Sequence, residues 1–300
     1  MTKLPVLSES KQADAFGYDQ AATEFAALTE RFSGGIAREM IRQAALRPTD
    51  RILDVGTGTG LLPHLVAAQG SGNEVVGIDL SSGMLEQARN RASREGLSRR
   101  LHFECMDAEH LAFPDSSFDT VFSLFVLRHL PDPLAALREA KRVAKPGCRI
   151  VITIGARPSL WSAPGMTSAI NFVVDQIMVQ SHRRALAPTA IRSFFQREGL
   201  RFADNIAAHR PLADVADLFA EAGIALKSRT WHRKRFRLDA VEFWQVQSVF
   251  DSAVREIINS LSPERRSDLR RKFIEEGQTI LDRGGALIYQ TGAYIYTGAR

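Results

Sequence analysis

The stretch from Asp50 to Gly60 joins an apolar strand pattern to three glycines, and their spacing restricts the ligand that it can bind. Its residues read Asp-Arg-Ile-Leu-Asp-Val-Gly-Thr-Gly-Thr-Gly. Glycines let the chain turn sharply and let a ligand lie against bare backbone, where a Cβ atom would clash. A dinucleotide-binding turn would need a glycine at position 61, where this chain has Leu61, and Asp54 would repel a pyrophosphate. The turn therefore favours a nucleoside without phosphates that carries an ammonium or sulfonium group.

Strands and helices alternate from residue 51 to residue 154, and these elements must position the glycine turn. We expect strands at 51–55, 74–79, 100–105, 118–124 and 148–154, and helices near 60–69, 82–95 and 133–143. Alternation with short connections predicts a parallel sheet built from right-handed crossovers. The carboxyl ends of such strands form the ligand-binding edge of an open α/β sheet.

Outside this core the alternation fails, and the remaining segments are mostly helical in pattern. Helices are predicted over 12–46, with a break at Gly34-Gly35, and then near 166–181, 187–198 and within 239–283. Two more strands are predicted, one near 224–237 and a closing antiparallel strand over 286–296 that Gly292 interrupts. The fold class is therefore α/β, with a doubly wound, mostly parallel seven-stranded sheet, an antiparallel last strand and a helical cap.

The composition of the 300 residues suits one large α/β domain with insertions, or a core with a cap. Apolar residues make up 45% of the chain, enough for a sizeable core. No apolar run approaches the length of a membrane span, and Met1–Lys11 lacks the apolar segment of a secretory signal. Cys105 and Cys148 are expected to be buried in strands, in a reducing cytoplasm. No Cys, His and Asp cluster has metal-ligand spacing, so no metal is expected.

Basic residues are concentrated in the C-terminal quarter of the chain. Residues 225–300 carry 14 basic and 9 acidic side chains, whereas residues 1–224 carry 25 of each, so the net charge of +5 lies in the last quarter. The densest part, residues 229–237, mixes basic and aromatic side chains. Such a mixture suits RNA, an anionic substrate or a membrane surface. The favoured interpretation is a solvated edge strand that its charges protect from aggregation.

Five motifs follow one another between residue 53 and the strand at 149–154. They are Leu53–Gly60, Gly77-Ile-Asp-Leu-Ser81, Met106-Asp107-Ala108, Phe118-Asp119-Thr120-Val121 and Pro146-Gly147. In this order and spacing they make segment 50–155 resemble the class I S-adenosylmethionine-dependent methyltransferases, most of all the small-molecule group that includes the ubiquinone and menaquinone C-methyltransferases. The resemblance implies a Rossmann-like fold, S-adenosyl-L-methionine as the methyl donor and S-adenosyl-L-homocysteine as the product.

With this resemblance, the chain is expected to divide into a cofactor-binding core and additions to it. Residues 1–46 would be N-terminal helices covering the cofactor site, 47–155 the cofactor-binding core, 156–210 a helical cap insertion, 211–237 a continuation of the core, 238–284 a second helical cap insertion and 285–300 the closing strand. Both insertions contain aromatic residues that form either helix-packing core or the wall of an apolar pocket: Trp161, Phe172, Phe194, Phe195, Phe243, Trp244 and Phe250.

The resemblance assigns cofactor contacts to the ends of the first two strands. Asp54 would hold the amino-acid end of the cofactor together with the turn residues Gly56, Thr57, Gly58 and Gly60. Asp79, which Leu80 follows, would accept hydrogen bonds from both ribose hydroxyls. In the alternative reading, Asp79 is a structural residue whose charge favours the N-terminus of the next helix.

Further contacts are implied at the ends of the third and fourth strands. Asp107 would accept a hydrogen bond from the adenine amino group, and Ala108 would supply a backbone contact. Met84 would either pack on the adenine face or belong to the core. Ser123 and Leu124 would lie beside the methionine part of the cofactor.

Two ring-bearing residues are candidates near the reaction centre. His129 is a candidate general base for an oxygen nucleophile, or a residue that caps and packs the loop before Pro131. Tyr18 matches a tyrosine that relatives carry ahead of the core and fold over the cofactor. Phe25 stands where relatives often have a second tyrosine, so one hydroxyl is missing here.

The function expected from this pattern is methylation of a medium-sized, partly apolar small molecule, such as a quinone, a polyketide or another secondary metabolite. Transfer to oxygen or carbon would proceed by in-line displacement, for which the protein mainly supplies orientation. One alternative is an RNA or protein methyltransferase that uses residues 229–237; another is a non-methylating cyclase, lyase-like enzyme or binding module on the same fold. A small-molecule substrate is the expected partner, without nucleic acid or a membrane span, and a homodimer is left open.

Overall fold

The glycine turn lies at the end of a strand in a parallel sheet. A computed structural model of the protein describes residues 7–70, 72–155, 178–179, 184–202 and 214–300. The chain divides into two compact units: Met1–Gly155 with His209–His232 and Ala293–Arg300, and Ala156–Ala208 with Arg233–Gly292. The helix expected near 166–181, Trp161 and Phe172 lie wholly or largely outside the described residues.

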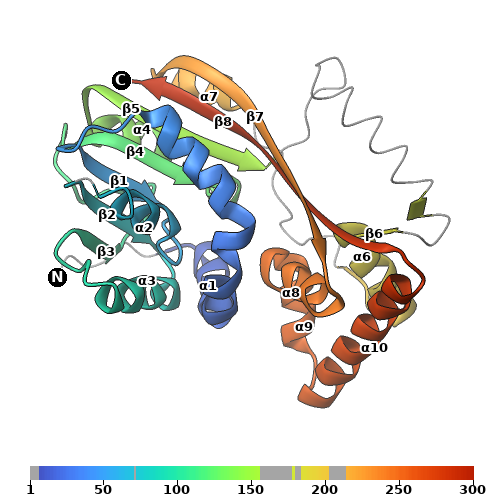
Figure 1. The fold of residues 1–300 in the computed structure, drawn as a ribbon. Coiled ribbons are helices and arrows are strands. Elements are labelled where there is room, and N and C mark those ends of the chain that lie inside the picture. The colour runs from blue at the N-terminus through green and yellow to red at the C-terminus, as the bar shows by residue number, and fades with distance from the viewer. Residues whose placement is uncertain (1–6, 71, 156–177, 180–183, 203–213) are drawn as a thin grey trace. The chain divides into compact units, whose positions relative to one another are not determined.

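The sheet has the doubly wound order of a Rossmann-like fold (Figure 1). Five neighbouring strands run parallel in the order β3 (Leu101–Cys105), β2 (Glu74–Asp79), β1 (Arg51–Val55), β4 (Phe118–Leu124) and β5 (Ala144–Gly155). Strand β8 (Ala286–Ala299) is antiparallel to β5, as predicted for the closing strand, and β7 (Ala225–Leu238) pairs with β8. All seven predicted strands are present, and a short additional strand, β6 (Arg184–Leu186), pairs with the start of β8.

The predicted interruption of the last strand at Gly292 is wrong. Strand β8 is continuous from Ala286 to Ala299. Glycine disfavours a strand through its backbone entropy and does not forbid one. Pairing of β8 with its neighbouring strands outweighs that cost.

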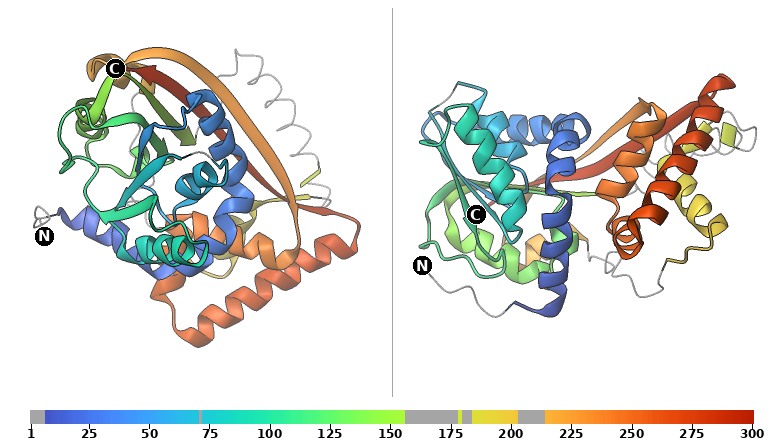
Figure 2. Two further views of the ribbon diagram at one scale, coloured as in Figure 1. Left: turned by 60° about the vertical axis from the view of Figure 1, so that its left-hand side comes forward. Right: turned by 90° about the horizontal axis from the view of Figure 1, so that it is seen from below.

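The helices of the first unit cover the two faces of the sheet. They are α1 (Glu9–Ala44), α2 (Leu61–Ala67), α3 (Ser82–Arg94), α4 (Pro133–Val143) and α7 (Val215–Glu221), with a 3₁₀ turn, η1, at Leu127–His129. Helix α1 packs against α2 and α3, as Figure 2 shows, and α4 packs against α7. This division follows from right-handed crossovers on either side of β1, where the strand order reverses between β1 and β4.

Helix α1 is one element of 36 residues, so the predicted break at Gly34-Gly35 is wrong. Residues on both sides of the glycines are buried in the core, among them Phe32, Ile36 and Met40. A glycine within a helix costs about 1 kcal/mol relative to alanine. Burial of several large apolar side chains stabilises the helix by more than that.

The second unit is a helical cluster with an aromatic core. Its described helices are α6 (Ala187–Arg197), α8 (Ala240–Phe250), α9 (Ser252–Ser260) and α10 (Pro263–Asp282). Phe243 of α8 stacks on Phe273 of α10 with ring centroids 5.6 Å apart, and Phe194 of α6 meets the same ring edge-on at 5.1 Å. Phe195 and Trp244 are also buried. These aromatic residues of the insertions therefore form helix-packing core.

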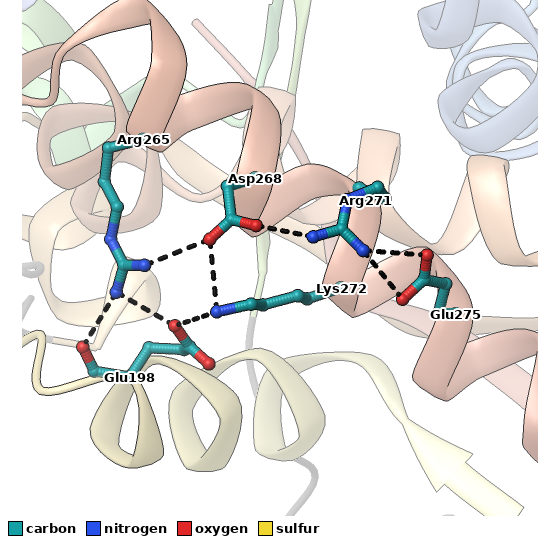
Figure 3. Close-up of polar contacts among 6 residues, drawn as sticks. All are labelled: Glu198, Arg265, Asp268, Arg271, Lys272 and Glu275. Atoms are coloured by element: carbon teal, nitrogen blue, oxygen red, sulfur yellow. Dashed lines mark hydrogen bonds and ion pairs between the residues drawn. The ribbon is translucent and has the colours of Figure 1, made fainter.

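Charged side chains join α6 to α10 on the surface of this unit (Figure 3). Glu198 accepts hydrogen bonds from Arg265 at 2.9 Å and from Lys272 at 3.2 Å. Asp268 binds the same two cations at 3.1 Å each. Arg271 extends the network from Asp268 to Glu275. The network ties the end of one helix to two turns of the other.

The two cysteines differ in burial. Cys148 is 2% exposed, as predicted, whereas Cys105 is exposed and its predicted burial is wrong. Cys105 ends β3, the edge strand of the sheet, so no other described strand lies along its outer side. No helix among the described residues is both long and apolar enough to cross a membrane.

Candidate functional site

The predicted cofactor residues meet at one edge of the sheet. Because β1 to β4 are parallel, their carboxyl ends lie together, and each end carries residues predicted to contact the cofactor. The glycine turn follows β1, Asp79 ends β2, Asp107 follows β3, and Ser123 and Leu124 end β4. Topology therefore gathers residues that are up to about seventy positions apart in the chain.

The glycine turn needs its glycines for backbone conformation and for close approach. Gly56, Gly58 and Gly60 have φ values of +67°, +53° and +79°, a region that other residues rarely adopt. A Cβ atom on Gly56 would collide with Val126 of the loop after β4, whereas nothing lies within 4 Å of a Cβ on Gly58. The N–H of Thr57 donates to the Ile78 carbonyl at 2.8 Å, which ties the turn to β2. A ligand can thus approach the backbone at Gly58.

Asp54 is a buried carboxylate with one oxygen still to be satisfied. Its Oδ2 accepts a hydrogen bond from the Thr57 hydroxyl at 2.7 Å, and its Oδ1 has no partner among the described residues. Burial raises the pKa of Asp54 to about 7; the Thr57 hydroxyl opposes this shift and the charge of Asp79 adds to it. A positively charged donor is what such an oxygen needs. The ammonium group of S-adenosylmethionine fits this requirement.

Asp79 holds the turn and the next helix together. Its Oδ2 accepts from the N–H of Gly58 at 2.8 Å and its Oδ1 from the N–H of Ser81 at 3.0 Å. Burial raises the pKa of Asp79, although these backbone donors oppose the shift. Each oxygen keeps a second lone pair that a hydroxyl can use. The carboxylate is therefore fixed in place and is able to accept from a diol; Leu80 lies next to it, partly exposed.

Asp107 has a partner that the sequence did not indicate. Lys11, near the start of α1, places its Nζ 2.7 Å from Asp107 Oδ2 and 2.7 Å from Glu109 Oε2. Ala108, between the two acids, is buried, and Met84 of α3 is 2% exposed. Burial of Met84 fits a core residue, so its contact with adenine stays a prediction. Lys11 is 96 positions from Asp107 and resembles any surface lysine in the sequence.

Helix α1 also brings residues to the loop after β4. The Tyr18 hydroxyl lies 3.4 Å from His129 Nε2, and Asp14 Oδ2 lies 3.5 Å from His129 Nδ1. One turn further, Asp19 accepts from the Ser81 hydroxyl at 2.6 Å and from the Gly83 N–H at 2.7 Å. The structure therefore joins the two predicted residues Tyr18 and His129 and adds Asp14 to them, whereas Asp19 binds the start of α3. Asp14 lies four residues before Tyr18, hence on the same face of α1, but no sequence motif marks it.

The loop after β4 contains a strained residue. Phe125 has a φ of +63°, unusual for a bulky side chain, and its N–H donates to the Thr153 hydroxyl at 3.1 Å. Its ring packs against the core of the first unit, which holds this conformation. Before it, Ser123 is buried with no hydrogen-bond partner for its hydroxyl in the described structure, and Leu124 is half-buried. Val126, the residue after Phe125, packs against Gly56.

Comparison with protein families places these strand ends within one domain. Residues 53–152 match the model of the methyltransferase domain, a range that contains the glycine turn, Asp79, Asp107 and Ser123. This stretch is a class I S-adenosylmethionine-dependent methyltransferase domain. The cofactor of the methyltransferase domain is S-adenosylmethionine. Among the described residues no group of three or more His, Cys, Asp or Glu is arranged to hold a metal ion.

Curated relatives of the methyltransferase domain act on small molecules, according to their names. The chain is 38% identical over 125 residues to 27-O-demethylrifamycin SV methyltransferase of Amycolatopsis mediterranei, a match that covers 42% of this chain and 43% of that relative. It is 32% identical over 161 residues to the ubiquinone/menaquinone biosynthesis C-methyltransferase UbiE of Cellvibrio japonicus, with 52% and 64% covered. The chain thus matches less than two thirds of the length of either relative.

The likeness to one solved structure extends over the whole chain. The 4+2 cyclase SpnF aligns with a TM-score of 0.59 and 18% identity, covering 100% of this chain and 99% of that chain. Likeness at this identity shows a shared fold. It agrees with a Rossmann-like sheet that carries helical additions.

Proposed function

We propose that this protein transfers the methyl group of S-adenosylmethionine to an oxygen or carbon atom of a medium-sized, partly apolar small molecule, such as a quinone, a polyketide or another secondary metabolite. The observation that carries the proposal is the buried Asp54, one oxygen of which has no hydrogen-bond partner among the described residues, ahead of a turn whose backbone is open at Gly58. The acceptor class is supported by the names of the two curated relatives, whose rifamycin and quinone substrates share that character.

Three acids at the carboxyl ends of the strands would each bind a different group of the cofactor. Asp54 would take the ammonium group, Asp79 the ribose hydroxyls and Asp107 the amino group of the base. S-adenosylmethionine, when bound, supplies a methyl group on a positively charged sulfur. The work of the protein is then to orient the acceptor and to exclude water, and orientation contributes on the order of 7–11 kcal/mol in model reactions.

His129 is the proposed general base for an oxygen acceptor. A neutral histidine accepts a proton at one ring nitrogen while the other carries a hydrogen. Asp14, 3.5 Å from Nδ1, favours the form with its hydrogen on Nδ1, so that Nε2 faces the Tyr18 hydroxyl with a lone pair. Transfer to carbon would need such a base only after the methyl group has been attached.

Recognition of the acceptor is assigned to the second unit, which lies outside the matched domain. Five of the described aromatic residues of the second unit are buried in its core, but Phe236, Phe250 and Tyr289 are only half-buried and stack in a row. Burial raises the pKa of Tyr289 to about 12, so its phenol stays protonated. These three rings are the proposed apolar contact for the acceptor.

Transfer of a tritiated methyl group to a panel of acceptors tests the proposal. The panel should contain demethylated quinones, hydroxylated polyketides, RNA and protein, with production of S-adenosylhomocysteine followed by mass spectrometry. We expect transfer to a quinone or polyketide, and none by an Asp79→Asn variant. Transfer to RNA that is lost on replacing Arg233, Lys234 and Arg235 would support a nucleic-acid substrate instead. An altered product without S-adenosylhomocysteine would support a cyclase or lyase-like enzyme.

A further inference from the structure

Three charged side chains form a buried cluster beside the proposed adenine contact. Lys11 Nζ lies 2.7 Å from one oxygen each of Asp107 and Glu109. The side chains of Lys11, Asp107 and Glu109 are 8%, 3% and 9% exposed. The distances are those of charge-assisted hydrogen bonds, so a single ammonium bridges two carboxylates away from water.

The cluster is fixed from several sides. Asp107 Oδ1 accepts from the Glu109 N–H at 3.0 Å, and Glu109 Oε1 accepts from the Asp132 N–H at 3.0 Å. His110 Nδ1 lies 3.6 Å from Asp107 Oδ2, but its side chain is 67% exposed. Lys11 is thus the buried cation that faces both acids.

We propose that Lys11 is a positioning residue of the cofactor site, which keeps Asp107 ionised and oriented as the acceptor for the amino group of adenine. The proposal rests on the proposed function, in which Asp107 makes that contact. Two buried carboxylates side by side do not both ionise without a cation, because each disfavours the charge of the other. Without Lys11 the pair would retain a proton, and Asp107 would present a carboxylic acid to the base.

The charges of the cluster agree with this role. Burial by itself would raise the pKa of Asp107, yet the hydrogen bonds from Lys11 and from the Glu109 N–H hold the pKa below its usual value. For Lys11, burial opposes the charge, but the two carboxylates raise the pKa of its ammonium. An ionised carboxylate accepts from a 6-amino purine, whereas a carboxylic acid also donates to a 6-oxo purine. Lys11 therefore sets which base the site prefers.

Calorimetric titration with S-adenosylhomocysteine and with its 6-oxo analogue, S-inosylhomocysteine, tests the inference. Asp107→Asn first checks the cofactor site itself: it should weaken binding of S-adenosylhomocysteine, and if it does not, the assignment of Asp107 is wrong. Lys11→Met should weaken the same ligand about tenfold or more, because a charged hydrogen-bond acceptor is lost. It should also reduce the preference for the 6-amino over the 6-oxo base. Lys11→Arg should retain the binding of the parent protein.

A second substitution separates this role from simple structural support. In a Lys11→Met, Glu109→Gln double variant the second acid is absent, so Asp107 should ionise again and recover most of the affinity and base preference. Raising the pH to about 9 should have the same effect on Lys11→Met alone. Lys145→Met, which removes a lysine paired with Asp119, is the matched control. The inference is overturned if Lys11→Met binds as tightly as the parent, or more tightly, while Asp107→Asn binds weakly.

Discussion

The strand ends of the first unit and the helices of the second unit differ in how their polar groups are used. At the strand ends, carboxylates are buried, one oxygen of Asp54 has no partner among the described residues, and the backbone takes strained or left-handed conformations. In the second unit the buried residues are mainly apolar, aromatic rings among them, and the charges of the network in Figure 3 lie largely on the surface. Binding a ligand requires particular polar atoms at particular positions. Helix packing requires only apolar side chains of suitable volume at the helical spacing. The first unit therefore contains sequence motifs that indicate its function, and the second unit does not.

Of the substitutions that compare the two regions, we expect the one at Asp79 to reduce cofactor binding most. Asp79→Asn should weaken binding of S-adenosylhomocysteine about a hundredfold, because two hydrogen bonds to a charged acceptor are weakened together. Isothermal calorimetry measures it, with Glu74→Gln at the exposed start of the same strand as control. Equal binding by both variants would remove Asp79 from the site.

Substitutions in the two cores act on stability, and we expect their effect on cofactor binding to be smaller than that of Asp79→Asn. Phe273→Ala should lower the free energy of unfolding of the second unit by about 3–5 kcal/mol, the usual result of deleting a buried ring. Phe122→Ala, in the core of the first unit, should cost a similar amount. Denaturant titration measures the stability of both variants, and calorimetry measures their cofactor binding. We expect Phe122→Ala to weaken cofactor binding and Phe273→Ala to leave it nearly unchanged. The reverse pattern would contradict the assignment of cofactor binding to the first unit.

A smaller effect is expected from the proton on Asp54. Its pKa of about 7 means that the carboxyl is largely protonated below that pH, and an ammonium partner binds the ionised form. Affinity for S-adenosylhomocysteine should therefore fall as the pH drops below 7, approaching about tenfold per pH unit, and should level off above 7. Titration calorimetry across this range measures the slope. Asp54→Asn should bind weakly and without that slope, so a variant that keeps the slope would assign it to another group.

The smallest effects are expected in the surface network. Glu275→Gln should leave the thermal unfolding midpoint unchanged, because Glu275 and its partner Arg271 are each 59% exposed and water screens the pair. Glu198→Gln should lower the midpoint measurably, since Glu198 is 20% exposed and meets two cations. Differential scanning fluorimetry compares the two. A larger loss from Glu275→Gln would show that the network stabilises the unit more than its exposure indicates.

Most of the first unit could be predicted from sequence because its elements are short and strongly patterned. The strands β1, β2 and β4, helix α4 and the antiparallel closing strand lie where the apolar pattern predicts them. Errors occurred where tertiary packing overrides a local rule. Gly34 and Gly292 lie inside continuous elements because neighbours pack or pair across them, and Cys105 is exposed because β3 forms an edge.

The sequence by itself determined where the strands of the core lie and which acids stand at the ends of the first three, because apolar periodicity and a glycine turn are local features of the chain. Tertiary structure alone decided which distant groups meet those acids. Lys11 reaches Asp107, and Asp14 and Tyr18 reach His129, because α1 folds along the sheet edge. No local pattern encodes such pairs, since an ion pair requires only complementary charge and a few ångströms of separation.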